Sequence, residues 1–260
     1  MYILFKEIAG VNSVIEGNAK LWRYMDFTKL VSLLATQSIY LRRSDEFKDV
    51  FEGVLFGYGV ENAREDIEAM FSEAGCSERF IQTRLEEAEE LANDVIERAE
   101  RNRKNVFINC WHLNEYESAA MWDLYLKSNE GIAIQTTFDK IKQSLNVCKE
   151  EIFIGKVKYI DHTKQKNLTE SYLEPFFTKR ISFKHEQEVR LVYALTPYHE
   201  EYDENSDVKG KGIQVSLTDL IERVYVSPDA DSWFVDVVKV VLEKFDIDAE
   251  VVHSDLYTIK

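Results

Sequence analysis

The sequence predicts a single α+β domain, residues 1–260, in which a mixed β-sheet packs against helices. Three observations predict this fold class. Short stretches with the two-residue period of strands alternate with helical stretches along most of the chain. A segment rich in Glu, Ala, Arg and Leu, residues 61–104, interrupts them without a proline and predicts a helical insertion. Near the C-terminus a strand, a helix and a strand follow one another, which favours parallel strands with a right-handed crossover.

The N-terminal part predicts a strand, a helix and a second strand. Residues 21–25 (LWRYM) alternate as a short strand, and Asp26 is a good N-cap for the helix that follows. Residues 38–42 (SIYLR) form the second strand, and an acidic loop comes after it. The helix is predicted from an apolar stripe at helical spacing: Phe27, Leu30, Val31 and Leu34.

The insertion, residues 61–104, is expected to form two helices, because Gly75 and Cys76 break an otherwise helical pattern. Such an insertion packs over the core or mediates homo-oligomerisation. A private domain is not expected at this length. After it, strands are predicted over residues 106–111, 131–138 and 152–161. Asn114, followed three residues later by Glu117, resembles a capping box that opens a helix burying Met121 and Tyr125. The C-terminal elements are a strand at 223–226, a helix around 234–245 and a strand at 249–253.

The stretch 178–195 (TKRISFKHEQEVRLVYAL) has the most unusual pattern. In its second half one face is apolar, and the other begins with Glu186, Glu188 and Arg190. Glutamate is a poor strand former, so two glutamates on the same face of one strand indicate a specific structural or functional role. Two acids on one face can divide roles, one ionised and stabilising charge, the other relaying a proton. A structural ion pair with Arg190, Lys184 or Arg23 on a surface-facing edge is the other interpretation.

Other polar and aromatic residues also have two interpretations. Arg23 lies between apolar neighbours, where it could clamp a phosphate or carboxylate, or pair with an internal acid such as Glu186 or Asp49. Trp122 lies off the apolar stripe of its helix and could line a pocket, although most such aromatic residues belong to the core. Four acids of the loop after the second strand could hold a metal, but a solvated loop is favoured and no metal is expected: Asp45, Glu46, Asp49 and Glu52.

Composition limits the function classes. The formal net charge of −15 disfavours non-specific binding to nucleic acid or to anionic membranes, since both require a basic surface. The three cysteines lack the CxxC spacing of a zinc site, and their odd number does not indicate a disulfide framework. The sequence shows no membrane-spanning run and no signal peptide, so a reduced, cytoplasmic protein is expected.

Four segments resemble a large bacterial family, domain of unknown function 2971. These are residues 21–53, the segment NCWHLNEYESAAMWDLYLKSNEGIAIQTTF, the segment KRISFKHEQEVRLVY and the segment RVYVSPDADSW. Their order matches the family's, including its Lys…Trp-x-x-Glu-x-Glu-x-Arg pattern. The sequence departs from that pattern in three ways: the acidic loop lacks a proline, His112 stands where Ser is common, and Phe183 replaces Trp.

The order of an arginine on the first strand and a late Glu-x-Glu strand also resembles ADP-ribosyltransferases, which bind NAD in a split α+β sheet. The resemblance implies that Arg23 holds the NAD phosphate, that Glu188 holds the nicotinamide-ribose hydroxyls and that Glu186 helps to activate a macromolecular acceptor. Chemically, a carboxylate beside the ribose would stabilise its oxocarbenium-like state. The remaining expected cofactor contacts come from Tyr24, Trp122, Thr136 and Arg190. A toxin or phage-defence effector is the implied setting.

Two alternatives come from other classes of protein. The first is a non-enzymatic binding or regulatory module in which residues 61–104 form the partner surface. The second is a metal-dependent nuclease using Asp49, Glu186, Glu188 and Lys184, against which the acidic balance argues. Deleting the insertion tests the first, and adding a chelator tests the second.

Overall fold

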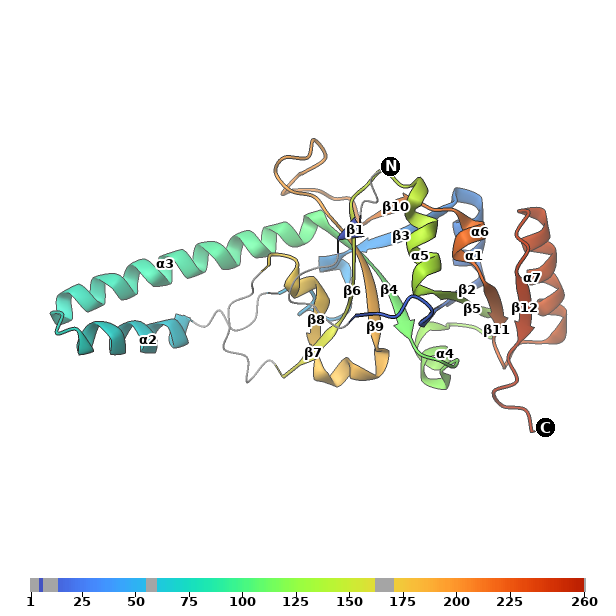
Figure 1. The fold of residues 1–260 in the computed structure, drawn as a ribbon, viewed down its shortest axis with the longest axis horizontal. Coiled ribbons are helices and arrows are strands. Elements are labelled where there is room, and N and C mark those ends of the chain that lie inside the picture. The colour runs from blue at the N-terminus through green and yellow to red at the C-terminus, as the bar shows by residue number, and fades with distance from the viewer. Residues whose placement is uncertain (1–4, 7–13, 55–59, 162–170, 260) are drawn as a thin grey trace.

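The structure is a computed structural model that describes residues 5–6, 14–54, 60–161 and 171–259. Its main sheet has the strand order β1-β6-β9-β4-β2-β5-β11-β12, with β3 and β10 branching from β4 (Figure 1). The sheet strands are β1 (Phe5–Lys6), β2 (Lys20–Asp26), β3 (Ser38–Arg43), β4 (Val106–Leu113), β5 (Gly131–Thr137), β6 (Ile152–Lys156), β9 (Glu188–Ala194), β10 (Gly210–Gln214), β11 (Arg223–Val226) and β12 (Glu250–His253). A separate pair consists of β7 (Lys158–Ile160) and β8 (Thr178–Arg180).

Along the chain the helices are interspersed with these strands, except that α2 and α3 follow one another directly. They are α1 (Phe27–Thr36), α2 (Val60–Glu73), α3 (Glu78–Asn102), α4 (Ala119–Tyr125), α5 (Phe138–Ser144), α6 (Leu217–Leu220) and α7 (Ser232–Lys244). Short 3₁₀ turns are η1 (Ser44–Glu46), η2 (Arg103–Asn105), η3 (Leu145–Val147), η4 (Glu174–Phe177) and η5 (Ile181–Glu186). Most strand pairs are antiparallel, whereas β1–β6, β11–β12 and the separate pair β7–β8 are parallel. The predicted α+β class with a mixed sheet is therefore confirmed, including the parallel C-terminal pair.

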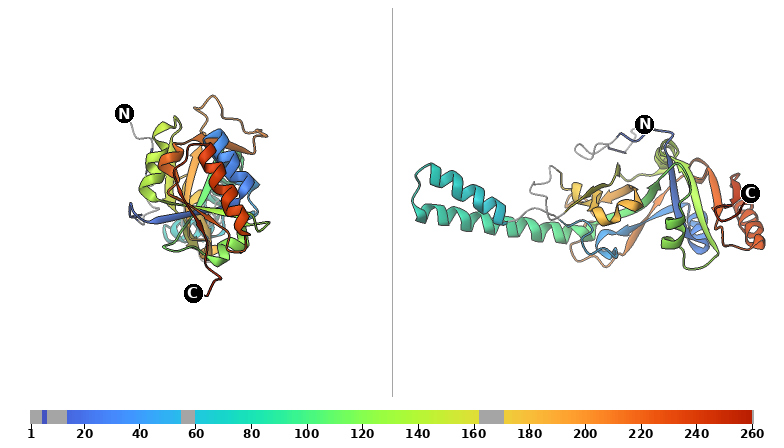
Figure 2. Two further views of the ribbon diagram at one scale, coloured as in Figure 1. Left: turned by 90° about the vertical axis from the view of Figure 1, so that its right-hand side faces the viewer. Right: turned by 90° about the horizontal axis from the view of Figure 1, so that it is seen from below.

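The two faces of the sheet are covered differently. One face packs on α1, α5, α6 and α7 and forms the large core, which contains Leu34, Trp111 and Phe234. The opposite face carries two smaller clusters: one around Phe176 and Phe177 of η4, the other around α4. On the first face α1 and α7 lie side by side (Figure 2, left). In an antiparallel pair, directly opposite residues point to the same face, so the register assigns each strand residue to one of these two sides.

Strand β4 is shared along its length by two partners on one edge. Its first half pairs with β3 through Arg42↔Ile108, and its last residues pair with β2 through Trp22↔His112. Between these two contacts, β2 and β3 diverge and leave a fork in the sheet. Cys110 O accepts a hydrogen bond of 2.9 Å from Arg23 Nη1 at the fork, so a side chain replaces the missing strand partner.

Helices α2 and α3 form an arm that projects from the sheet (Figure 1). The predicted break lies between them, where Gly75 adopts a φ of 72° and the side chain of Ser77 caps α3. Phe71 and Phe80 pack edge to face at 5.5 Å across the arm. At its base the arm is tied to the acidic loop, because Arg103 O accepts from Ser44 Oγ at 2.8 Å and Arg103 Nη2 donates to Val50 O.

Several local predictions are corrected by the structure. Asp26 precedes α1 without capping it, and its carboxylate accepts from the N–H of Lys127 instead. The capping box at Asn114 does not form, since α4 begins only at Ala119 after Ser118. The predicted strand 152–161 is two strands, because β6 pairs with β9 and β7 pairs with β8. Tyr125, expected in the core, is 40% exposed.

Candidate functional site

The alternating strand of the sequence is β9, and it lies in the middle of the sheet between β4 and β6 rather than at a surface edge. Both of its faces are buried. Val189 and Leu191 enter the large core, while Glu188 and Arg190 point to the opposite face with Val192. The strand begins only at Glu188, because Gln187 adopts a left-handed conformation with a φ of 41°. Glu186 therefore belongs to the turn η5 and not to the strand register.

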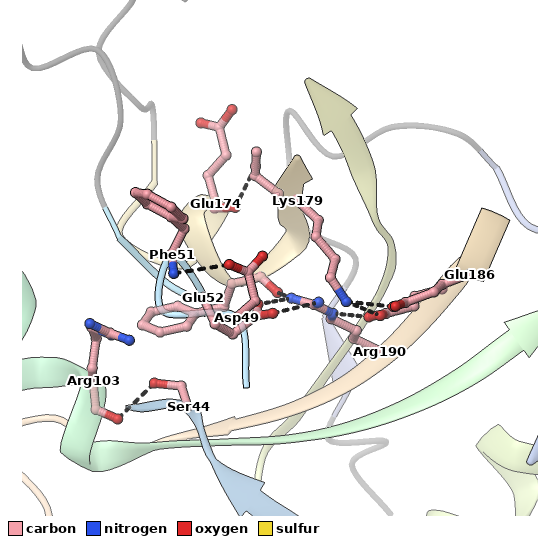
Figure 3. Close-up of polar contacts among 12 residues, drawn as sticks. Ser44, Asp49, Phe51, Glu52, Arg103, Glu174, Lys179, Glu186 and Arg190 are labelled. Carbon is pink, nitrogen blue, oxygen red and sulfur yellow. Dashed lines mark hydrogen bonds and ion pairs between the residues drawn. The ribbon is translucent and has the colours of Figure 1, made fainter. Parts of the chain in front are cut away.

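Five charged side chains meet on this face in a continuous buried network (Figure 3). Lys179 of β8 donates to both carboxylates of the sequence motif, to Glu188 at 2.7 Å and to Glu186. Arg190 Nε donates to Glu188 Oε2 at 2.5 Å, and its two terminal nitrogens donate to the two carboxylate oxygens of Glu52. Arg190 Nη1 also donates to Phe176 O at 2.7 Å. The carboxylates are thus connected to one another through cations.

The network contains three carboxylates and two cations, so full ionisation leaves one excess negative charge in a desolvated place. The pKa of Glu186 is raised to about 8, first by burial and then by its hydrogen bond and repulsion with Glu188, and Lys179 opposes this only in part. Burial alone would also raise the pKa of Glu188, but Arg190 and Lys179 hold it well below its usual range. Two neighbouring glutamates therefore differ in protonation at neutral pH: Glu186 neutral, Glu188 ionised.

The other members of the network are fixed by their partners. Burial raises the pKa of Glu52, although the guanidinium of Arg190 opposes this shift. For Arg190 burial acts to lower the pKa, yet Glu188 and Glu52 together raise it above its usual value. The bidentate contact with Arg190 gives Glu52 a fuller set of donors than Glu186 has. We therefore place the shared proton of the network on Glu186.

Aromatic residues of the sequence prediction meet beside this network, on the same face. Tyr24 and Trp122 pack edge to face at 4.9 Å, and both are buried. Their polar ends are satisfied, since Tyr24 Oη accepts from Ser118 N at 2.8 Å and Trp122 Nε1 donates to Glu117 at 2.9 Å. Trp122 is thus a core residue of the smaller cluster. Glu117 holds Trp122 in place rather than capping α4.

Arg23 stands apart from the carboxylates. Its register partner Ile134 belongs to the large core, and the Arg23 guanidinium lies 5.9 Å from the ring centre of Trp111. Among the residues that the structure describes, no carboxylate pairs with it, and burial lowers its pKa. Within the described ranges, the one hydrogen bond of its side chain goes to Cys110 O at the fork. The guanidinium therefore belongs to a half-buried residue without a counter-ion in the described part of the chain.

Tyr125 connects the two halves of the site. Burial raises the pKa of its hydroxyl, and the charges of Glu186 and Glu188 raise it further, whereas Arg23 acts to lower it. Its phenol therefore lies within electrostatic range of both the glutamate pair and the arginine. Tyr125 itself is 40% exposed.

The predicted residues are thus only partly brought together. Glu186, Glu188 and Arg190 meet, and Tyr24 meets Trp122, but Thr136 pairs with Leu21 on the large-core side. Its Oγ1 is buried without a hydrogen-bond partner among the described residues. Asp49 does not join the glutamates, because it pairs with Arg180 at 2.8 Å. Within the described ranges, no group of three or more metal-ligating side chains forms.

Sequence reasoning missed two members of the network, Lys179 and Glu52. Lys179 opens the segment KRISFKHEQEVRLVY, whose resemblance to a family pattern with an early lysine was a usable signal. Glu52 had no such signal, because a loop acid more than a hundred residues away gives no sign of its partner.

Comparisons with known proteins support part of the family resemblance. Residues 121–191 match the model of the family described as protein of unknown function DUF2971. The matched DUF2971 segment runs from α4 through Lys179, Glu186, Glu188 and Arg190, and so contains four of the five charged residues of the network. No curated protein and no solved structure matches the chain. The resemblance to ADP-ribosyltransferases has no support from these comparisons. No helix in the described part of the chain is long and apolar enough to cross a membrane.

Proposed function

We propose that the protein is an enzyme that cleaves the glycosidic bond of NAD and transfers the ADP-ribose, with the glutamate pair as its chemical centre. One observation carries this proposal: Lys179 holds two neighbouring carboxyl groups whose pKa values are pushed apart. A neutral and an ionised carboxyl group side by side can serve proton transfer and charge stabilisation in cleavage of a bond to a sugar.

In the proposed reaction the bond between ribose C1′ and the nicotinamide nitrogen breaks, and its electron pair leaves with nicotinamide. The ionised Glu188 stabilises the resulting oxocarbenium-like ribose electrostatically. A hydroxyl group of the acceptor, or water, then bonds to C1′, and its proton passes to the deprotonated form of Glu186. The reaction therefore requires the minor, ionised form of Glu186 at neutral pH, and its rate is expected to rise towards pH 8.

The unpaired Arg23 supports an anionic substrate. A half-buried guanidinium without a carboxylate partner among the described residues is costly, and a phosphate group would supply the missing negative charge. Arg23 belongs to the large-core face of the sheet and the glutamates to the other face, so one molecule would join the two groups through the fork between β2 and β3, near Tyr125. A dinucleotide has its phosphates and its reactive ribose on one molecule, which suits a site with a cation at one end and carboxylates at the other.

The test is release of nicotinamide from NAD by the purified protein, measured with and without cell extract as a source of acceptor. Glu186→Gln removes the titrating group while keeping its shape and should lower the release by 10²-fold or more, roughly the size of a general-base contribution. The exposed Glu243 of α7 provides a matched control, and Glu243→Gln should behave as the unaltered protein. Equal activity of the two variants, or no release under any condition, contradicts the proposal.

A binding or regulatory module remains the second candidate, favoured by the projecting arm. Helices α2 and α3 contact mainly each other, and the α3 run Glu86–Glu97 includes six acids and no base. An acidic arm of this kind suits a basic protein partner. If the arm is the functional part, its removal abolishes partner binding while Glu186→Gln has no effect on it.

A further inference from the structure

His112 is a buried histidine whose tautomer follows from one hydrogen bond. It lies on β4 directly opposite Glu188, and the whole residue is only 6% exposed. Its Nδ1 lies 2.7 Å from the backbone oxygen of Glu186. A carbonyl oxygen accepts hydrogen bonds and cannot donate one, so Nδ1 must carry the proton. Burial lowers the pKa of this imidazole, which favours the neutral form.

The second ring nitrogen is consequently a free acceptor. In a neutral imidazole protonated at Nδ1, Nε2 has a lone pair and no hydrogen. This Nε2 is buried, and it has no hydrogen-bond partner in the part of the chain that the structure describes. Buried polar atoms are nearly always hydrogen-bonded, so an exception calls for a bound group that the protein itself does not supply.

The surroundings of His112 indicate what kind of group would fit. The ring of Tyr24 lies 6.3 Å away from the imidazole at an angle of 61°, and Trp122 packs against Tyr24. The hydrogen bond from Nδ1 also ties His112 to the backbone of Glu186, the residue that carries the titrating carboxyl group. An acceptor bordered by aromatic rings and joined to Glu186 suits a flat, neutral molecule that carries an N–H donor.

We propose that His112 Nε2 is a ligand-binding acceptor that takes a hydrogen bond from the carboxamide N–H of a planar heterocycle. This inference rests on the proposed function, in which the leaving group is such a carboxamide. His112 acts here as a positioning residue for the leaving group. The carbonyl of Glu186 keeps Nδ1 protonated, and this contact is what keeps Nε2 able to accept.

Nicotinamide and nicotinate provide a matched pair of probes. They share the same ring, but at neutral pH the amide donates hydrogen bonds and the carboxylate only accepts them. We expect nicotinamide to bind at least tenfold more tightly than nicotinate. On adding nicotinamide to protein labelled with ¹⁵N at histidine, the Nε2 signal of His112 should move towards that of a hydrogen-bonded nitrogen, and nicotinate should leave it in place.

Two variants separate hydrogen bonding from packing. His112→Gln can place an acceptor oxygen near the position of Nε2, whereas His112→Leu keeps bulk and removes the acceptor. Nicotinamide affinity should therefore be largely kept in His112→Gln and reduced at least tenfold in His112→Leu. If His112→Leu does not fold, the ¹⁵N measurement on the unaltered protein decides alone.

The outcomes distinguish this inference from the proposed function. An Nε2 signal that neither probe moves at saturation, as expected if only water occupies the place, overturns the inference. Equal affinities for the two probes do the same. Release of nicotinamide from NAD together with either result means that only the inference fails. A nicotinamide-dependent Nε2 shift without NAD cleavage means that the binding site stands and the proposed function fails.

Discussion

Lys179 Nζ lies 2.7 Å from Glu188 Oε1, and the same ammonium group contacts Glu186. Both carboxylates thus depend on one cation, while Glu188 has Arg190 as a second. This unequal sharing explains why the two glutamates differ in protonation although they are only two residues apart. Titration of Glu186 is therefore expected to change both the stability and the activity of the protein with pH.

Stability should fall as the pH rises, because of Glu186. Its pKa is about 8 in the folded protein and near the ordinary value of 4.5 when unfolded, so between these values only the folded state holds the proton. The contribution of Glu186 to the free energy of unfolding is therefore lost as the pH rises from about 4.5 to 8. Glu186→Gln should make the urea-unfolding profile flatter across this range, and Glu243→Gln should leave it unchanged. Parallel profiles for Glu186→Gln and the unaltered protein would contradict the assignment of the proton.

Arg190→Met should be among the most destabilising substitutions in the chain. It leaves Glu52 and Glu188 buried without their shared cation, and breaking a buried pair in this way costs about 3–5 kcal/mol. Arg223 is the control, since it also sits on a strand and pairs with Glu250, but at an exposed position. Arg223→Met should therefore cost less than about 1 kcal/mol in denaturant unfolding. Similar losses for the two variants would show that the network is not desolvated.

Arg23 should respond to anions. If its missing counter-ion is a phosphate, ADP-ribose at about 100 times its Kd should stabilise the protein by about 2.7 kcal/mol, seen as a higher Tm. Arg23→Met should abolish this gain, whereas Arg42→Met, on the exposed side of β3, should retain it. In the absence of ligand, Arg23→Met breaks no ion pair within the described residues, but it leaves Cys110 O without its donor and should cost about 1–3 kcal/mol. A Tm of Arg23→Met that still rises with ADP-ribose would place the anion elsewhere.

Gly53 should tolerate substitution far less well than Gly75. Both adopt a φ of 72°, so alanine meets the same backbone strain at each. At Gly53, however, the added Cβ would lie 2.4 Å from Phe176 Cε1, while at Gly75 nothing lies within 4 Å. Gly53→Ala should therefore cost about 1–3 kcal/mol more than Gly75→Ala in urea unfolding. Because Gly53 follows Glu52, this variant should also disturb the network. Equal costs would mean that Phe176 can move aside.

Removing most of the arm should leave the sheet folded. Helices α2 and α3 pack largely on each other, and Leu85 is buried within α3 rather than in the sheet clusters. Replacing residues 62–98 by a short Gly/Ser linker keeps Asn102, which accepts from Tyr202 Oη. The shortened protein should lose helical circular dichroism, and its Tm should change by only a few degrees. Loss of cooperative unfolding would show instead that the arm is needed for the core.

Periodicity predicted the parts of the fold that depend on local pattern. The helix after Asp26, the break at Gly75 and the parallel C-terminal pair all follow from spacing that the structure reproduces. The faces of β9 were also separated correctly from Glu188 onward. The predicted alternation wrongly included Glu186, because the left-handed conformation of Gln187 breaks the strand before Glu188. A single backbone angle of this kind cannot be detected in a hydrophobic pattern.

The site was predicted less completely, for a physical reason. Charges near each other in sequence suggested the pair Glu186 and Glu188, but their neutralisation depends on Lys179 and on Arg190, which Glu188 shares with Glu52 from a distant loop. The position of Arg23 depends on the fork between β2 and β3, which arises only when both strands compete for β4. Contacts of this kind follow from tertiary arrangement, and the local pattern of one sequence does not contain them.

The base of the arm connects it mechanically to the charged network. Helix α3 continues into η2, where Arg103 holds Ser44 and Val50, and Val50 lies two residues before Glu52 (Figure 3). Because α3 is a continuous helix, a change in the direction of its axis at the outer end of the arm also displaces its C-terminal end at η2. A partner protein that binds the outer end of the arm would therefore first displace the loop that contains Val50 and Glu52.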